Sequence, residues 1–235
     1  MSREIGLHGL IEAITRVSGL SPRGDWSGQL TYALANVASL RGTTVEAIVD
    51  DSAGWSLLMP VFLNAVTVRE TFFLRHSGQF DYVVDDIRGR LNVAKDSTIR
   101  VLSAGCATGE EPYSLAIAIH SRLGPEALSR VHILASDISP EAISKARAGV
   151  YTAWAFRDAP PWLAEDYFEQ GANAGTRIVP AIRRSVTFEV TNILHQAAAL
   201  TNASIDAIFF RNVAIYLNPT TRDEIFREFF RILKP

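Results

Sequence analysis

Residues 99–137 constrain the fold of this chain more than any other segment. A short apolar run (99–104), a turn with two glycines, a helical pattern (110–121) and a second apolar run (131–137) follow one another. Strand, turn, helix and strand in this order predict a βαβ unit with parallel strands and a right-handed crossover. The segment therefore predicts an α/β fold.

The same alternation continues to the end of the chain. Ser139-Pro140-Glu141 supplies an N-cap, a first-turn proline and a first-turn acid, so a helix is expected there, with Gly149 as its C-cap. Residues 186–190 alternate like a strand, residues 205–210 form another apolar run, and Asn218-Pro219 opens a last helix. These elements predict a doubly wound, largely parallel sheet that helices cover on both faces.

Two regions differ from this pattern. Apolar side chains at helical spacing near the N-terminus predict a helical domain over residues 1–85, followed by a sheet domain over residues 86–235. Residues 150–186 are punctuated by proline and glycine and predict a small subdomain inserted into the sheet domain. A doubly wound sheet that ended at Pro235 would leave an unpaired edge, so we expect its last strands beyond this residue.

The composition excludes several classes of protein. With 23 basic and 25 acidic side chains the net charge is −2, which argues against a dedicated nucleic-acid binder. No apolar stretch reaches roughly 18 residues, so no membrane insertion is expected. The N-terminus lacks a secretion signal, which favours a cytoplasmic protein. One cysteine excludes a disulfide framework, and the five histidines show no metal-ligand spacing, so we predict no metal site.

The residues after the first strand favour a cationic ligand. Open α/β sheets bind ligands beyond the carboxyl ends of their strands. Gly105 and Gly109 allow close approach to the backbone there, but neither a dinucleotide fingerprint nor a phosphate loop is present. Glu110 and Glu111 open the next helix and disfavour a pyrophosphate at its N-terminus, so a sulfonium cofactor is preferred over NAD. The alternative is that these acids only complement the helix dipole.

Polar residues also follow the other strands. Asp137 ends the second strand, where a carboxylate can accept hydrogen bonds from the ribose hydroxyls of an adenosine. Asn192 follows the third strand, and Arg211 with Asn212 follows the fourth, where the reactive end of a cofactor would lie. Taken singly, each of these positions is equally well explained by a turn or a helix cap. Cys106 has no histidine near it in the sequence and is interpreted as a buried packing residue.

Four motifs of the chain resemble those of the chemoreceptor glutamate methyltransferases, the CheR family. The stretch SAGCATGEEPYS (residues 103–114) resembles the first cofactor motif of that family and is the most specific of the four. The others are VTVRETFFLR (66–75), ASDI (135–138) and FRNVAIY (210–216). The resemblance covers nearly the whole chain, and the order and spacing of the motifs match the family.

The resemblance implies S-adenosylmethionine as cofactor and S-adenosylhomocysteine as product, on the Rossmann-like fold of the S-adenosylmethionine-dependent methyltransferases. By position, Arg75 and Tyr216 would lie near the transferred methyl group and would be the catalytic residues. Asp137 would hold the ribose, and Asn192 with Ile193 would flank the adenine. The full set of residues implied to bind the cofactor is Thr71, Arg75, Ala104, Gly105, Glu110, Asp137, Asn192, Ile193, Arg211 and Asn212.

The resemblance also implies a reaction and a partner. Proteins of the CheR family form methyl esters on glutamates of the cytoplasmic helices of methyl-accepting chemoreceptors, so the same reaction in chemotaxis-type signalling is expected here. The helical domain and a small inserted antiparallel subdomain of the family match residues 1–85 and 150–186 by position. Trp154-Ala155-Phe156-Arg157 resembles members that carry C-terminal repeat domains, and such a domain would lie outside this chain.

Two positions depart from the family, and other functions stay open. Arg69 stands where the family has an asparagine, and His76 stands where it has an acid. One alternative is a cofactor-binding signalling or scaffold domain that no longer methylates. Another is a methyltransferase that acts on a different protein or on a small molecule. An NAD-dependent oxidoreductase is disfavoured because the glycine fingerprint is missing.

Overall fold

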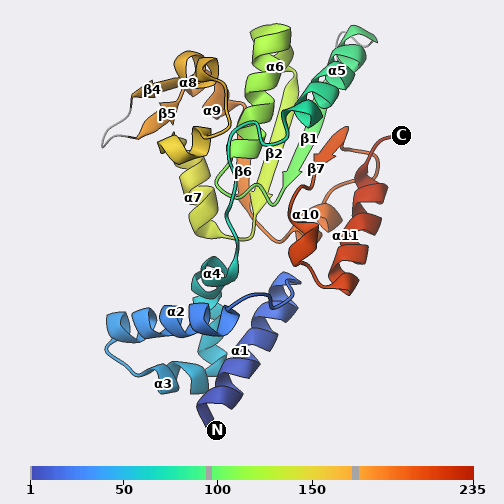
Figure 1. The fold of residues 1–235 in the computed structure, drawn as a ribbon. Coiled ribbons are helices and arrows are strands. Elements are labelled where there is room, and N and C mark those ends of the chain that lie inside the picture. The colour runs from blue at the N-terminus through green and yellow to red at the C-terminus, as the bar shows by residue number, and fades with distance from the viewer. Residues whose placement is uncertain (1, 94–96, 171–174) are drawn as a thin grey trace.

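Four parallel strands form the central sheet of the computed structural model, which describes residues 2–93, 97–170 and 175–235. Their order is β6-β2-β1-β7 (Figure 1). The strands are β1 (Ile99–Ala104), β2 (Val131–Asp137), β6 (Val186–Val190) and β7 (Ala207–Phe209). The predicted α/β fold with a parallel sheet is confirmed.

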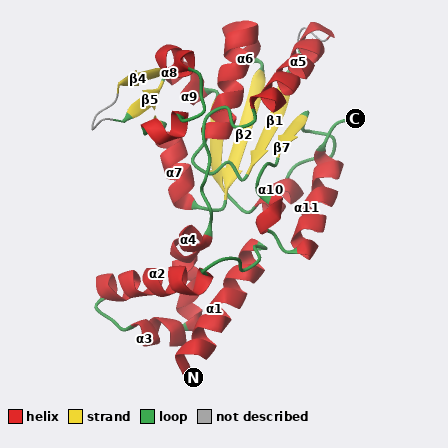
Figure 2. Ribbon diagram, in the orientation of Figure 1, coloured by secondary structure: helices red, strands yellow, loops and turns green. Residues whose placement is uncertain are grey.

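Helices lie on both sides of this sheet (Figure 2). Successive residues of a strand point to opposite faces of a sheet and therefore toward different helices. Val101 and Ile133 belong to an apolar core shared with α5, α6 and α7. Their neighbours Leu102 and Leu134 point the other way and pack with α10 and α11. The sheet is therefore covered on both faces, as a doubly wound fold requires. These helices are α5 (Ser77–Val93), α6 (Glu110–Ser129), α7 (Pro140–Ala148), α10 (Ile193–Ala199) and α11 (Pro219–Ile232).

The predicted cap residues take the expected positions around α7. The Ser139 hydroxyl accepts a hydrogen bond from the Ala142 backbone N–H at 3.1 Å, and Pro140 occupies the first turn. Gly149 ends the helix in the left-handed region at φ 63°. This helix follows β2 directly, and its N-terminus therefore lies beside the carboxyl edge of the sheet.

The chain segment that joins α7 to β6 forms a second, antiparallel sheet with strand order β3-β5-β4. It confirms the predicted insertion, of which residues 171–174 lie outside the described part of the chain. Its strands and helices are β3 (Val150–Tyr151), α8 (Pro161–Tyr167), β4 (Phe168–Gln170), β5 (Thr176–Ile178) and α9 (Pro180–Arg184).

The N-terminal region is helical, as predicted, and has an apolar core of its own. It consists of α1 (Ser2–Ser18), α2 (Trp26–Arg41), α3 (Val45–Asp50) and α4 (Trp55–Val66). The division of the chain at residue 85 stays a prediction. Phe80 and Leu91, on either side of that position in α5, both pack in the core of the sheet. Among the described residues, no helix combines the length and the apolar character that a membrane crossing needs.

Candidate functional site

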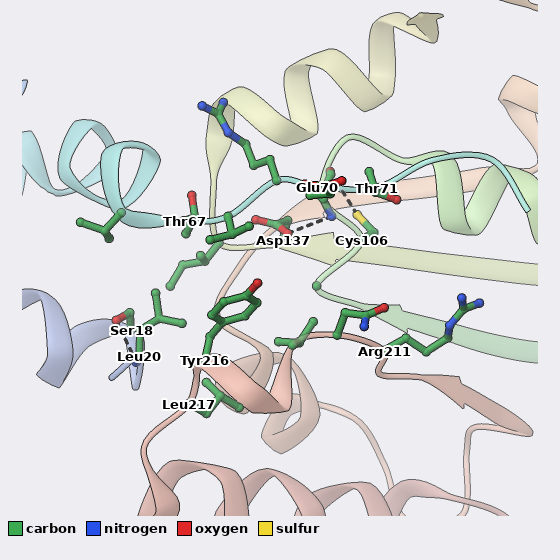
Figure 3. A pocket seen from close by; sticks show the side chains of 18 of the residues that line it. Ser18, Leu20, Thr67, Glu70, Thr71, Cys106, Asp137, Arg211, Tyr216 and Leu217 are labelled. Atoms are coloured by element: carbon green, nitrogen blue, oxygen red, sulfur yellow. Dashed lines mark hydrogen bonds between the residues drawn. The ribbon is translucent and has the colours of Figure 1, made fainter. Parts of the chain in front are cut away.

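A cavity of about 390 Å³ lies at the carboxyl edge of the parallel sheet (Figure 3). Each of the four strands contributes the residues that follow or end it. They are Gly105, Cys106 and Ala107 after β1, Asp137 and Ile138 at the end of β2, Asn192 and Ile193 after β6, and Arg211, Asn212 and Val213 after β7. This is the edge at which doubly wound sheets bind ligands, and the volume suits a small molecule.

Much of the remaining cavity wall comes from two segments that precede the sheet in sequence. One is the loop between α4 and α5, which contributes Thr67 to Phe72 and Arg75. The other runs from the end of α1 into α2 and contributes Ser18, Leu20, Ser21, Arg23, Gly24, Asp25, Trp26 and Gln29. The motifs of the sequence did not indicate this second segment, because it carries no cluster of catalytic residue types.

Most of the predicted site residues line the cavity. They are Thr71, Arg75, Gly105, Asp137, Asn192, Ile193, Arg211, Asn212 and Tyr216. Ala104 and Glu110 do not line it, and they are 0% and 4% exposed. The Glu110 carboxylate instead accepts a hydrogen bond from the Thr108 hydroxyl at 2.7 Å, and burial raises its pKa.

Glu111 faces the cavity in place of Glu110. Successive residues of an α-helix point about 100° apart, so only one of these two neighbouring acids can face a given side. The sequence places both acids at the start of α6 but does not give the rotation of the helix. Packing of α6 against the sheet decides which acid reaches the cavity.

The turn after β1 requires glycine at position 105. Gly105 has φ 77°, and a Cβ atom there would lie 2.5 Å from Cγ2 of Val213. The backbone N–H groups of Gly105 and Cys106 both donate to the Ser136 carbonyl at 2.8 Å. The turn is thereby tied to the end of β2, and it brings bare backbone to the cavity wall.

Asp137 is held in a fixed orientation by the backbone around it. One carboxylate oxygen accepts from the Ala107 N–H and the other from the Ser139 N–H, each at 2.9 Å. Burial raises the pKa of Asp137, while these hydrogen bonds and the charge of Arg69 act in the opposite direction. Each carboxylate oxygen has a further lone pair, so the group can still accept hydrogen bonds from a ligand.

Glu111 and two arginines form the second charged group of the cavity. The Glu111 carboxylate accepts from the Ser103 hydroxyl at 2.8 Å and lies 3.5 Å from Nε of Arg211. Arg211 also donates from Nη2 to the carbonyl oxygen of Arg75. Its Nη1 is buried and has no hydrogen-bond partner among the described residues. A buried guanidinium with a free donor favours an anionic ligand.

Arg75 lies in a strained part of the chain. Its neighbours Leu74 and His76 have φ 57° and 58°, which is uncommon for residues other than glycine. Phe73 holds this segment in place, because its side chain is fully buried and its N–H donates to the Ala155 carbonyl at 2.9 Å. Strain of this kind persists only where the surroundings over-determine the backbone, and it is typical of binding sites.

Arg157 joins the same loop to the inserted subdomain. Its guanidinium lies 4.0 Å from the centre of the Phe72 ring and 4.4 Å from that of the Trp154 ring. It also forms an ion pair with Glu70 at 3.1 Å. Cation–π contacts with both rings and the ion pair with Glu70 hold the loop against the insertion.

The remaining candidates each have a clear position. Arg69 pairs with Glu141 at 2.9 Å, so this departure from the family places a cation beside Asp137. Cys106 borders the cavity, but it is 2% exposed and belongs to the apolar core of the sheet, as expected for a packing residue, and burial raises its pKa. Tyr216 extends its ring toward the cavity from the segment after β7 (Figure 3).

Comparison with known proteins gives consistent matches. The family model described as "CheR methyltransferase, SAM binding domain" matches residues 69–235. The "Chemotaxis protein methyltransferase" of Salmonella typhimurium is 35% identical over 79% of this chain and 62% of its own length. The protein of the same name from Escherichia coli is 36% identical over 74% of this chain and 59% of its length. The "Probable biofilm formation methyltransferase WspC" of Pseudomonas putida is 35% identical over 74% of this chain and 40% of its length.

Proposed function

The chain belongs to the CheR methyltransferase family, and on that basis we propose that it transfers the methyl group of S-adenosylmethionine to glutamate side chains of chemoreceptor cytoplasmic helices. The chain spans about three fifths of the length of its chemotaxis relatives, 62% and 59%. The observation that carries the proposal is the cavity, which joins a carboxylate suited to a ribose with two arginines suited to an acceptor carboxylate. The protein would act in the cytoplasm, where those receptor helices lie.

The residues of the cavity fit the cofactor. Asp137 would accept hydrogen bonds from the ribose hydroxyls, since its carboxylate is already fixed by two backbone N–H groups. Asn192 and Ile193 would flank the adenine. Glu111 would face the ammonium group, because it lines the cavity and Glu110 does not. When bound, S-adenosylmethionine supplies a methyl group on a positively charged sulfur.

Arg75 and Arg211 would receive the acceptor glutamate. The two residues are already joined through the carbonyl oxygen of Arg75, and Nη1 of Arg211 has no partner among the described residues. A glutamate with an ordinary pKa of about 4.3 is ionised at neutral pH, so no general base is needed. The chain then contributes mainly by orienting this nucleophile, an effect that can supply roughly 7–11 kcal/mol. Tyr216 would orient the attacking oxygen.

Transfer of labelled methyl groups tests the proposal. Purified protein is mixed with labelled S-adenosylmethionine and membranes that contain chemoreceptors, and base-labile release of methanol reports ester formation. We expect transfer by the wild-type protein and a loss of at least tenfold for Arg75→Ala, with a smaller loss for Tyr216→Phe. Thermal unfolding of each variant verifies that the fold is retained.

Two other results would redirect the assignment. Binding of S-adenosylhomocysteine without any methyl transfer would favour a signalling or scaffold domain. Transfer to a different protein or to a small molecule, but not to receptors, would favour another methyltransferase. Full activity of Arg75→Ala would remove this residue from the site.

A further inference from the structure

The segment Gly19–Asp25, here called the strap, connects α1 to α2 and forms part of the cavity wall. Its Leu20, Ser21, Arg23, Gly24 and Asp25 line the cavity. The strap belongs to the helical region in sequence, yet it lies against the part of the sheet domain that follows β7 (Figure 1). In Figure 3, Leu20 lies beside Tyr216 and Leu217.

Backbone hydrogen bonds fasten the strap to the segment that carries Tyr216. The Ser21 N–H donates to the Tyr216 carbonyl at 2.7 Å, and the Asn218 N–H donates to the Gly19 carbonyl at 2.9 Å. Between these two bonds, Leu20 and Leu217 form an antiparallel bridge. The strap therefore behaves as a short extra strand beside Tyr216.

Two asparagine side chains strengthen this attachment, because each caps one helix and also donates a hydrogen bond to a carbonyl at the end of α1. Asn218 accepts from the Thr221 N–H at 2.9 Å, which caps α11, and its Nδ2 donates to the Gly19 carbonyl at 2.9 Å. Asn192 caps α10 through the Leu194 N–H at 2.8 Å, and its Nδ2 donates to the Val17 carbonyl at 3.0 Å.

These bonds satisfy carbonyl groups at the end of α1. The last carbonyls of a helix have no partner within the helix, so they need donors from elsewhere. The two asparagines supply such donors from the sheet domain. The helical region is thereby anchored at the starts of two helices that flank the cavity.

Gly19 permits the close contact on which this anchor depends. It has φ 74°, and a Cβ atom there would lie 2.4 Å from Cγ2 of Thr221, in the first turn of α11. Glycine thus lets the end of α1 approach α11 closely enough for both bonds from Asn218 to form.

We propose that Asn218 is a positioning residue that holds the strap over the cofactor and so determines how long the cofactor stays bound. This inference rests on the proposed function of the cavity. Asn218 does not line the cavity, so its effect on the ligand passes through the strap. A ligand in the cavity contacts the strap residues. If the strap is attached more weakly, the ligand is less enclosed and dissociates faster.

Two substitutions separate the attachment from the helix cap. Asn218→Asp and Asn218→Ser both retain an oxygen that caps α11 about as well as asparagine does. Neither can donate to the Gly19 carbonyl in the way that Nδ2 does, and only the first adds a charge. Dissociation of S-adenosylhomocysteine, followed by stopped flow, should be about two- to tenfold faster in both variants, as expected for one lost hydrogen bond.

The rate of trypsin cleavage after Arg23, an exposed residue of the strap, measures the attachment of the strap without a ligand. Both variants should be cut there faster than the wild type, and S-adenosylhomocysteine should slow the cut in the wild type. Thermal unfolding of the free proteins verifies that the cap of α11 is intact.

The possible outcomes decide between the two proposals. If the wild type binds S-adenosylhomocysteine and both variants release it and are cut at the wild-type rates, the strap inference is overturned. It is also overturned if only the aspartate variant differs, because the added charge then accounts for the effect. If the wild type does not bind S-adenosylhomocysteine, the proposed function fails. The attachment of the strap is then judged from cleavage of the free proteins. Faster cleavage of both variants supports a role of Asn218 in holding the strap, and cleavage at the wild-type rate overturns it.

Discussion

The carboxylate of Glu111 lies 3.5 Å from Nε of Arg211, and both side chains are almost buried. Burial raises the pKa of Glu111 and lowers the pKa of Arg211, although each charge favours the ionised form of the other. For each group, burial shifts the pKa more than the charge of the partner does. A buried pair of this kind is therefore weak evidence for stability of the fold, whereas loss of one partner leaves an uncompensated charge.

Removal of one partner of this pair should cost more than removal of both. Glu111→Gln or Arg211→Gln alone leaves one buried charge without compensation, and we expect each to lower the free energy of unfolding by about 3 kcal/mol. The double variant should be more stable than either single variant. Urea denaturation of all four proteins measures the coupling, and strictly additive losses would contradict the pairing.

Affinity for S-adenosylhomocysteine should fall as the solution becomes acidic. Burial raises the pKa of Asp137, so this carboxylate is protonated at a higher pH than an exposed aspartate. A protonated group accepts hydrogen bonds from the ribose less well, and affinity is therefore lost as the pH falls through the raised pKa. The stability of the free protein has the opposite pH dependence. Because the pKa of Asp137 is raised in the folded chain, its contribution to stability is fully present at low pH and is lost as the pH rises through the raised pKa.

Calorimetric titration at stepped pH tests this dependence, with Asp137→Asn as the comparison. The asparagine variant should bind about tenfold or more weakly near neutral pH, as expected for the loss of a charged acceptor. Its affinity should also vary less with pH than that of the wild type. Equal affinity of the two proteins at neutral pH would remove Asp137 from the ribose site.

Gly105→Ala should damage both the fold and the binding of the cofactor. The new Cβ would meet Val213 at 2.5 Å in a backbone conformation that alanine rarely adopts. We expect a loss of about 1–3 kcal/mol in the free energy of unfolding. Gly89→Ala is the matched control, since nothing lies within 4 Å of its Cβ position in α5. The control should be neutral or stabilising by up to about 1 kcal/mol, because alanine is the better helix former.

Cys106 should react slowly with thiol reagents. Burial raises its pKa well above the usual value, and the side chain is 2% exposed, so little thiolate is present or accessible at neutral pH. Alkylation by iodoacetamide, followed by mass spectrometry, should be much slower than in urea, and S-adenosylhomocysteine should slow it further. Rapid alkylation of the native protein would show that the turn after β1 opens readily.

Local signals in the sequence predicted the elements of the sheet domain well. The strand at residues 99–104 has the predicted bounds, and Ser139 and Gly149 cap α7 as expected. These features depend on apolar runs and on cap chemistry, both of which are local. The helix predicted to end at Ser121 continues only to the break at Gly124, where φ is 86° and ψ is 171°, and a second short helical segment then runs to Ser129.

The parts of the site that depend on packing could not be predicted from local patterns in the sequence. Glu110 and Glu111 are adjacent, and only the rotation of α6 against the sheet decides which one lines the cavity. Arg23 and the rest of the strap reach the cavity because the end of α1 is hydrogen-bonded to the cap residues of α10 and α11. That contact joins residues nearly 200 positions apart, such as Gly19 and Asn218, and no local pattern indicates it.

The contacts of Arg157 with the Phe72 and Trp154 rings couple the motion of two segments. The loop with Thr71 and Arg75 and the start of the insertion are joined into one unit, which the Phe73 N–H bond to Ala155 stiffens further. A displacement of the three-stranded sheet would therefore carry Arg75 with it. A molecule that binds the outer surface of the insertion and moves it would therefore also move Arg75, the residue expected beside the reacting methyl group.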